Sequence, residues 1–112
     1  MYDDEQMQNI RFEISRALEA VRRQIDAMNG DKSQMWAIYE ALDAQRSRLS
    51  DIVWHSPHAS VYHGKFTKAY NDVDEAAQYF SFAQGSNDDD RPGHLATTAR
   101  FITDAVEALV FT

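Results

Sequence analysis

The chain has 112 residues, of which 44% are hydrophobic and 26% charged, and it contains no cysteine. This composition is typical of one soluble globular domain and argues against a disordered tail. Without cysteine the chain cannot form disulfides, iron–sulfur clusters, thiolate zinc sites or cysteine nucleophiles. The formal net charge is −7, and residues 72–112 hold most of it, with two basic and eight acidic side chains. Nucleic-acid binding needs a basic surface, so we expect no direct nucleic-acid partner, whereas a basic protein partner fits.

The first residues, Met1 to Gln6, are acidic where a secretory signal would be basic. No apolar stretch approaches the roughly 20 residues of a membrane span. We therefore expect a cytoplasmic protein that has no membrane partner. No motif in the sequence requires a cofactor, so none is expected.

Apolar residues recur every three or four positions over residues 3–28, which predicts an amphipathic helix. Its apolar stripe comprises Met7, Ile10, Ile14, Ala17, Leu18, Val21, Ile25 and Met28. Asn29-Gly30 favours a helix stop, because glycine adopts the left-handed backbone conformation without penalty. A second helix is predicted over residues 33–54, with a stripe made of Met35, Ile38, Tyr39, Leu42, Leu49, Ile52 and Val53.

A third helix is predicted over residues 57–83, with Ser56 as its cap and Pro57 at its first position, where proline is favoured. Gly64 weakens its first turns. Residues 84–93 are rich in aspartate and glycine and predict an acidic loop, which a last helix over residues 94–111 follows. Four amphipathic helices with short links predict an all-α, up-down-up-down four-helix bundle that forms a single domain over residues 1–112. The alternative is a helical hairpin that completes or extends its core by dimerisation.

Three of the four histidines lie close together in the sequence, at His55, His58 and His63. Imidazole and carboxylate groups are common metal ligands, so Asp51, His55 and His58 form a candidate metal site. However, His58 and His63 are five residues apart, whereas a metal-binding pair on one helix needs a spacing of four. We therefore interpret these histidines first as helix-end and turn residues, with no bound metal.

The segment Val61–Phe66 resembles the histidine end of the motif of HEPN domains, small helical bundles that include many ribonucleases. That motif is an arginine and a histidine with four to six residues between them. When His63 is taken as the histidine, His58 stands where the arginine belongs. Arg48 and His55 have the right spacing, but the residues after His55 differ from the pattern. The resemblance implies that these arginine and histidine side chains would act on RNA phosphate at a dimer groove.

Four large aromatic residues lie away from the predicted stripes, namely Phe12, Trp36, Phe82 and Phe111. Because aromatic residues are enriched at protein interfaces, we expect some of them to form a surface for a homodimer or for another protein. The other interpretation is that their rings close the bundle.

Loop aspartates give the chain a second candidate binding feature, at Asp88, Asp89 and Asp90, which would attract a basic partner. The first functional hypothesis is therefore a small acidic helical protein that binds another protein. It would act as a regulator, an inhibitor, or an immunity or antitoxin protein, with no catalysis of its own. The alternative is an enzyme or a metal-binding bundle that uses residues 51–63.

Overall fold

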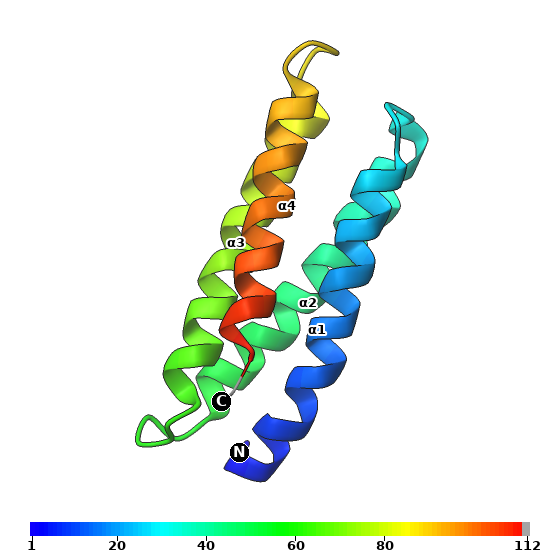
Figure 1. Cartoon of the computed structure of the whole chain (residues 1–112). Helices are drawn as coiled ribbons and strands as arrows, with labels where there is room; N and C mark the ends of the chain where they lie inside the picture. Colours follow the sequence, from blue (N-terminus) through cyan, green and yellow to red (C-terminus); the bar gives the residue numbers. More distant parts are fainter. Residues whose placement is uncertain (111–112) are drawn as a thin grey trace.

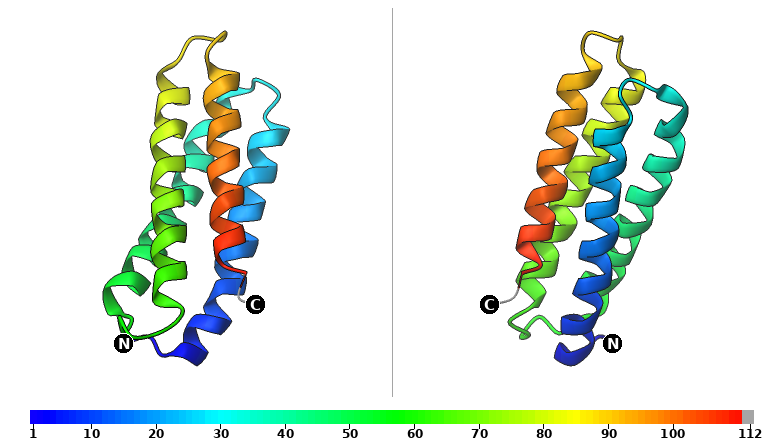
Figure 2. Two further views of the ribbon diagram at one scale, coloured as in Figure 1. Left: turned by 60° about the vertical axis from the view of Figure 1, so that its left-hand side comes forward. Right: turned by 45° about the vertical axis from the view of Figure 1, so that its right-hand side comes forward.

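The computed structural model of the chain describes residues 1–110, and within them it contains helices and no strand (Figure 1). The elements are α1 (Asp4–Ala27), a 3₁₀ turn η1 (Lys32–Gln34), α2 (Met35–His55), α3 (His63–Gly85) and α4 (Arg91–Ala108). Successive helices run in opposite directions (Figure 2). Each helix packs against its neighbours in the chain, and α4 returns to α1 to close the ring. The predicted antiparallel four-helix bundle is confirmed, and it measures 45 × 21 × 18 Å.

Helix α1 begins and ends as its sequence predicts. The Asp3 carboxylate accepts a hydrogen bond from the Gln6 backbone at 2.8 Å, and the Gln6 side chain accepts one from the Asp3 backbone at 3.0 Å. This reciprocal pair satisfies two of the amide groups that the first turn leaves free. After α1, Asn29 and Gly30 both have positive φ angles, 49° and 83°. They end the helix because this backbone conformation cannot continue it.

The predicted start of the third helix at residue 57 is wrong. Ser56 has an extended backbone that ends α2, and residues 57–62 form a turn before α3 begins at His63. The Ser60 hydroxyl accepts a hydrogen bond from the Tyr62 backbone at 3.2 Å and donates one to Asp4 at 2.5 Å. Such side-chain bonds compete with helix formation and stabilise a turn instead. Pro57 therefore lies in a loop.

The acidic loop is shorter than predicted. Helix α3 continues through Gly85, and α4 begins at Arg91, so only residues 86–90 connect them. Pro92 lies in the first turn of α4, where its missing N–H group has no helical partner to lose. The sequence rule that proline and glycine mark loops therefore placed this helix start a few residues late.

The core lies along the axis of the bundle, and the predicted apolar stripes supply it. Phe66 and Phe80 of α3 are its largest fully buried side chains. Four alanines of α3 are also buried, which lets α4 pack closely against α3 over its whole length. The buried apolar residues are Met7, Ile14, Leu18, Val21, Ile25, Met28, Met35, Ile38, Leu42, Leu49, Ile52, Phe66, Ala69, Val73, Ala76, Ala77, Phe80, Ala83, Ile102, Ala105 and Leu109.

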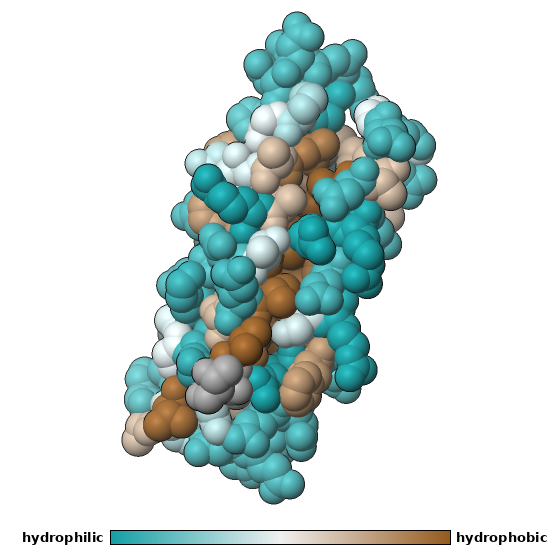
Figure 3. Space-filling view, in the orientation of Figure 1, coloured by the Kyte–Doolittle hydropathy of each residue, from teal (hydrophilic) through white to brown (hydrophobic). Residues whose placement is uncertain are grey.

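The outside of the bundle is mostly hydrophilic. In the view of Figure 3, a narrow hydrophobic band follows the seam between α1 and α4, and hydrophilic side chains cover most of the remaining surface. None of the helices within residues 1–110 combines the length and the apolar character needed to cross a membrane.

Candidate functional site

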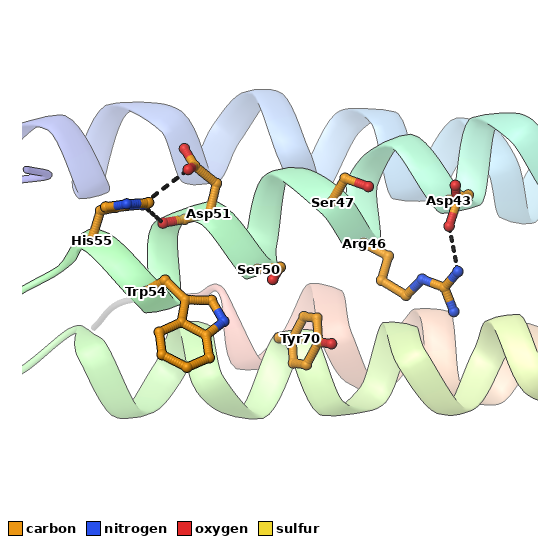
Figure 4. A pocket seen from close by; sticks show the side chains of 8 residues that line it. All are labelled: Asp43, Arg46, Ser47, Ser50, Asp51, Trp54, His55 and Tyr70. Carbon is orange, nitrogen blue, oxygen red and sulfur yellow. Dashed lines mark hydrogen bonds and ion pairs between the residues drawn. The ribbon is translucent and has the colours of Figure 1, made fainter.

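The most exposed tryptophan lies beside a hollow between α2 and α3. Trp54, near the end of α2, is 81% exposed. The hollow has a volume of about 420 Å³ and is lined by Asp43, Arg46, Ser47, Ser50, Asp51, Trp54, His55 and Tyr70 (Figure 4). Trp54 also lines a smaller hollow of about 200 Å³ together with Val53, His58 and His63. Trp54 therefore borders both hollows.

Both tryptophans of the chain lie on one outer face of α2. Trp54 follows Trp36 by 18 residues, which is about five turns of helix and about 27 Å along its axis. Trp36 is 66% exposed, although its ring stacks on the ring of Tyr39, with 6.0 Å between the ring centroids. At helical spacing the same face carries two acids and two serines. We call this surface the α2 face; it consists of Trp36, Glu40, Asp43, Ser47, Ser50 and Trp54.

The N-terminal segment is attached to the end of α2 beside this hollow. The Tyr2 hydroxyl donates a hydrogen bond to Asp51 at 2.7 Å, and the Tyr2 backbone N–H donates one to the His55 carbonyl at 2.8 Å. Asp51 also pairs with the His55 ring, 2.9 Å from the Asp51 carboxylate. The hydrogen bond to Asp51, helped by partial burial, raises the pKa of Tyr2 above its ordinary value of 10.0.

We expect Tyr2 to ionise at higher pH than an ordinary tyrosine. Because its folded-state pKa is raised, its hydrogen bond to Asp51 stabilises the fold below pH 10, and this contribution is lost as pH rises through the raised pKa. The ionisation of Tyr2 is measured as the part of the tyrosinate absorbance that is lost in Tyr2→Phe. In Asp51→Ala the pKa of Tyr2 should return toward its ordinary value. An unchanged titration in Asp51→Ala would show that Asp51 does not cause the shift.

The three central histidines do not come together. His55 binds Asp51, whereas the ring of His58 packs against the ring of His63 with 4.4 Å between their centroids. The Nδ1 atom of His63 also lies 2.7 Å from the Ser56 hydroxyl. Ser56 is buried, so that hydroxyl holds the end of α2 against the start of α3. Within residues 1–110, no three histidine, aspartate, glutamate or cysteine side chains gather closely enough to hold a metal ion.

The residues of the HEPN-like pattern already have partners in the structure. Arg48 forms an ion pair with Glu13 of α1 at 2.9 Å, and His55 binds Asp51. His58 and His63 lie at the other side of Trp54, where both line the smaller hollow. The structure therefore divides the four residues of this alternative between two places at the same end of the bundle.

Three of the four predicted binding aromatics lie at the surface, and Phe111 is outside the described residues. Phe12 is 50% exposed, with the Arg11 guanidinium 4.4 Å from its ring centroid. Phe82 is 53% exposed and makes edge contacts with Tyr79 and His94. Phe12, Trp36 and Phe82 belong to three different helices, α1, α2 and α3. Sequence reasoning missed Trp54, although the 18-residue spacing of the two tryptophans could have revealed it.

One of the three loop aspartates, Asp88, is paired with nearby cations. Asp88 accepts a hydrogen bond from Arg91 at 2.8 Å and forms an ion pair with Lys32 at 3.2 Å. These contacts lower the pKa of Asp88, and the hydrogen bond from Arg91 has the largest effect. Asp89 and Asp90 are exposed. Arg91 is itself buried, and it donates to the Ser86 carbonyl at 2.9 Å, so it ties the end of α3 to the start of α4.

Comparison of the chain with protein-family models, with curated proteins and with solved structures gave no match. The comparisons thus add nothing to the HEPN resemblance, which depends on a few residues between 48 and 66. A function must therefore be inferred from the geometry of the surface and from the distribution of charge.

Proposed function

We propose that this chain is a protein-binding module that docks another protein on the α2 face and has no catalysis of its own. It would act as a regulator, an inhibitor, or an immunity or antitoxin protein. The observation that carries this proposal is the pair of exposed tryptophans five turns apart on α2, with a hollow beside one of them. Tryptophan is the residue most characteristic of interface hot spots, because it buries a large area with little loss of rotamer freedom.

The net charge of −7 supports a basic partner. Opposite charges accelerate encounter, and added salt screens this attraction at distances beyond about 8 Å at physiological ionic strength. The α2 face carries Glu40 and Asp43, and Asp51 lies beside it. A basic surface opposite these carboxylates would therefore bind faster at low salt.

Affinity capture from an extract of the cells that make the protein tests the proposal. We expect the wild-type chain to retain a specific protein at low salt, and the double variant Trp36→Ser plus Trp54→Ser to lose it. Phe12→Ser is the matched control, because it removes an exposed aromatic ring from α1 and should retain the same protein. Equal capture by the wild type and the double variant, or no specific capture at low salt, would contradict the proposal.

Self-association is the homodimer version of the same proposal. If the exposed tryptophans of the α2 face pair two copies, sedimentation should show a dimer at high micromolar concentration, and Trp36→Ser plus Trp54→Ser should shift it to a monomer. Circular dichroism of the variant should stay helical, since both side chains are exposed. A wild-type chain that remains monomeric at that concentration removes the homodimer and leaves binding to a different protein in place.

A further inference from the structure

We propose that the hollow beside Trp54 binds an arginine or lysine side chain of the partner. This inference rests on the proposed function and specifies its chemistry. The hollow lies between α2 and α3, at the end of the bundle where the N-terminal segment is attached. Its walls combine aromatic rings, carboxylates and small hydroxyl side chains, a combination suited to a cation.

Two aromatic rings border the space. Trp54 belongs to α2 and Tyr70 to α3, and Figure 4 shows both rings projecting toward the gap between these helices. Between Asp43 and Trp54, α2 lines the hollow with Arg46 and with two small serines, Ser47 and Ser50. A cation near the face of an indole or phenol ring is attracted by the negative charge of that face, most strongly for tryptophan.

Charges around the hollow favour a cation over an anion. The carboxylates of Asp43 and Asp51 line it, and Asp74 of α3 forms an ion pair with Arg46 at 3.3 Å. Arg46 is the one arginine or lysine among its lining residues, and Asp43 and Asp74 both pair with its guanidinium. The groove therefore already holds one guanidinium between carboxylates from two helices.

Asp51 is the carboxylate nearest in sequence to Trp54. Its Oδ2 accepts a hydrogen bond from the Tyr2 hydroxyl, and its Oδ1 lies 2.9 Å from Nδ1 of the His55 ring. A carboxylate has about four lone-pair positions, so Asp51 can accept a further hydrogen bond from an incoming ammonium or guanidinium. In Figure 4 the Asp51 carboxylate lies on the side of α2 toward α1, and the two rings lie on the side toward α3, so the cation would sit over the outer face of α2 between them.

Titration of the labelled chain with N-acetyl-arginine amide, followed by amide chemical shifts, tests the inference. We expect saturable shifts at Ser50, Trp54 and Tyr70. The neutral isostere N-acetyl-citrulline amide should bind at least about ten-fold more weakly, because it lacks the charge that the rings and carboxylates attract. Tyr70→Leu and Asp51→Asn should each weaken arginine binding at least about three-fold.

Asp89→Asn is the matched control for Asp51→Asn. It removes the same charge from the loop at the opposite end of the bundle (Figure 1), so it should change arginine binding less than about two-fold at physiological salt. Equal binding of citrulline, shifts centred on residues 88–90, or equal weakening by Asp51→Asn and Asp89→Asn would overturn the inference. If these outcomes occur while protein capture still depends on Trp54, the inference fails and the proposed function stands.

Discussion

Replacing Phe80 with alanine is expected to lower the free energy of unfolding by about 3–5 kcal/mol, the usual cost of removing a buried aromatic ring and leaving a cavity. Phe80 is fully buried in the core. Its ring lies in stacked orientation against Tyr39 of α2, with 6.4 Å between centroids. The substitution therefore removes contacts that join α3 to α2. Urea unfolding followed by circular dichroism measures the change.

Phe82→Ala is the matched control, since it makes the same substitution two residues away on the same helix. Its ring is 53% exposed, so we expect a loss of less than about 1 kcal/mol. A loss at position 82 as large as that at position 80 would mean that the core does not lie where the structure places it. A negligible loss at Phe80 would contradict the bundle in the same way.

Replacing Trp54 with alanine is expected to weaken binding to the captured partner by at least about 2 kcal/mol, or about 30-fold in Kd, the level that defines a hot spot. The indole stands between two hollows and is highly exposed in the free chain, so a partner can bury most of its surface. Because it contributes little to the core, unfolding stability should change by less than about 0.5 kcal/mol. Calorimetric titration of the wild type and the variant gives both affinities.

Phe12→Ala separates a specific contact at Trp54 from a general loss of surface hydrophobicity. Phe12 is also half exposed, but it belongs to α1 and lies outside the α2 face. Its removal should change affinity by less than about 0.5 kcal/mol. Equal effects at Trp54 and Phe12 would mean that the partner does not distinguish these surfaces.

The helices could be predicted from the sequence where local signals agree. In α1 the apolar stripe, the acids of the first turn and the Asn29-Gly30 stop all indicate the same element, and its predicted ends differ from the observed ones by one residue. The start of α3 could not be predicted in this way, because Ser56-Pro57 also fits a helix start. The turn is stabilised instead by Ser60, whose contact with Asp4 joins residues 56 positions apart.

The candidate site was only partly predictable. Exposure of Phe12 and Trp36 follows from helical periodicity alone. Trp54 was missed because it directly follows two stripe residues, the buried Ile52 and the partly buried Val53, and the predicted helix ended there. The hollow itself depends on how α2 packs against α3, because Tyr70 meets Ser50 and Trp54 only in the folded bundle.

Contacts across long sequence separations were also beyond prediction. The hydrogen bond between Tyr2 and Asp51 joins positions 49 apart, and the sequence gives no sign of it. The pairing of His58 with His63 likewise depends on the turn at residues 57–62. Periodicity places a side chain on one face of its own helix, whereas such contacts depend on how the helices pack.

Site-specific photo-cross-linking tests most directly whether the α2 face is the docking surface. A photoreactive amino acid at Glu40 lies on that face and leaves Trp36 and Trp54 intact, whereas the same amino acid at Phe12 lies on α1. We expect position 40 to cross-link the partner and position 12 to give no cross-link. Cross-linking from position 12 but not from position 40 would contradict docking on the α2 face.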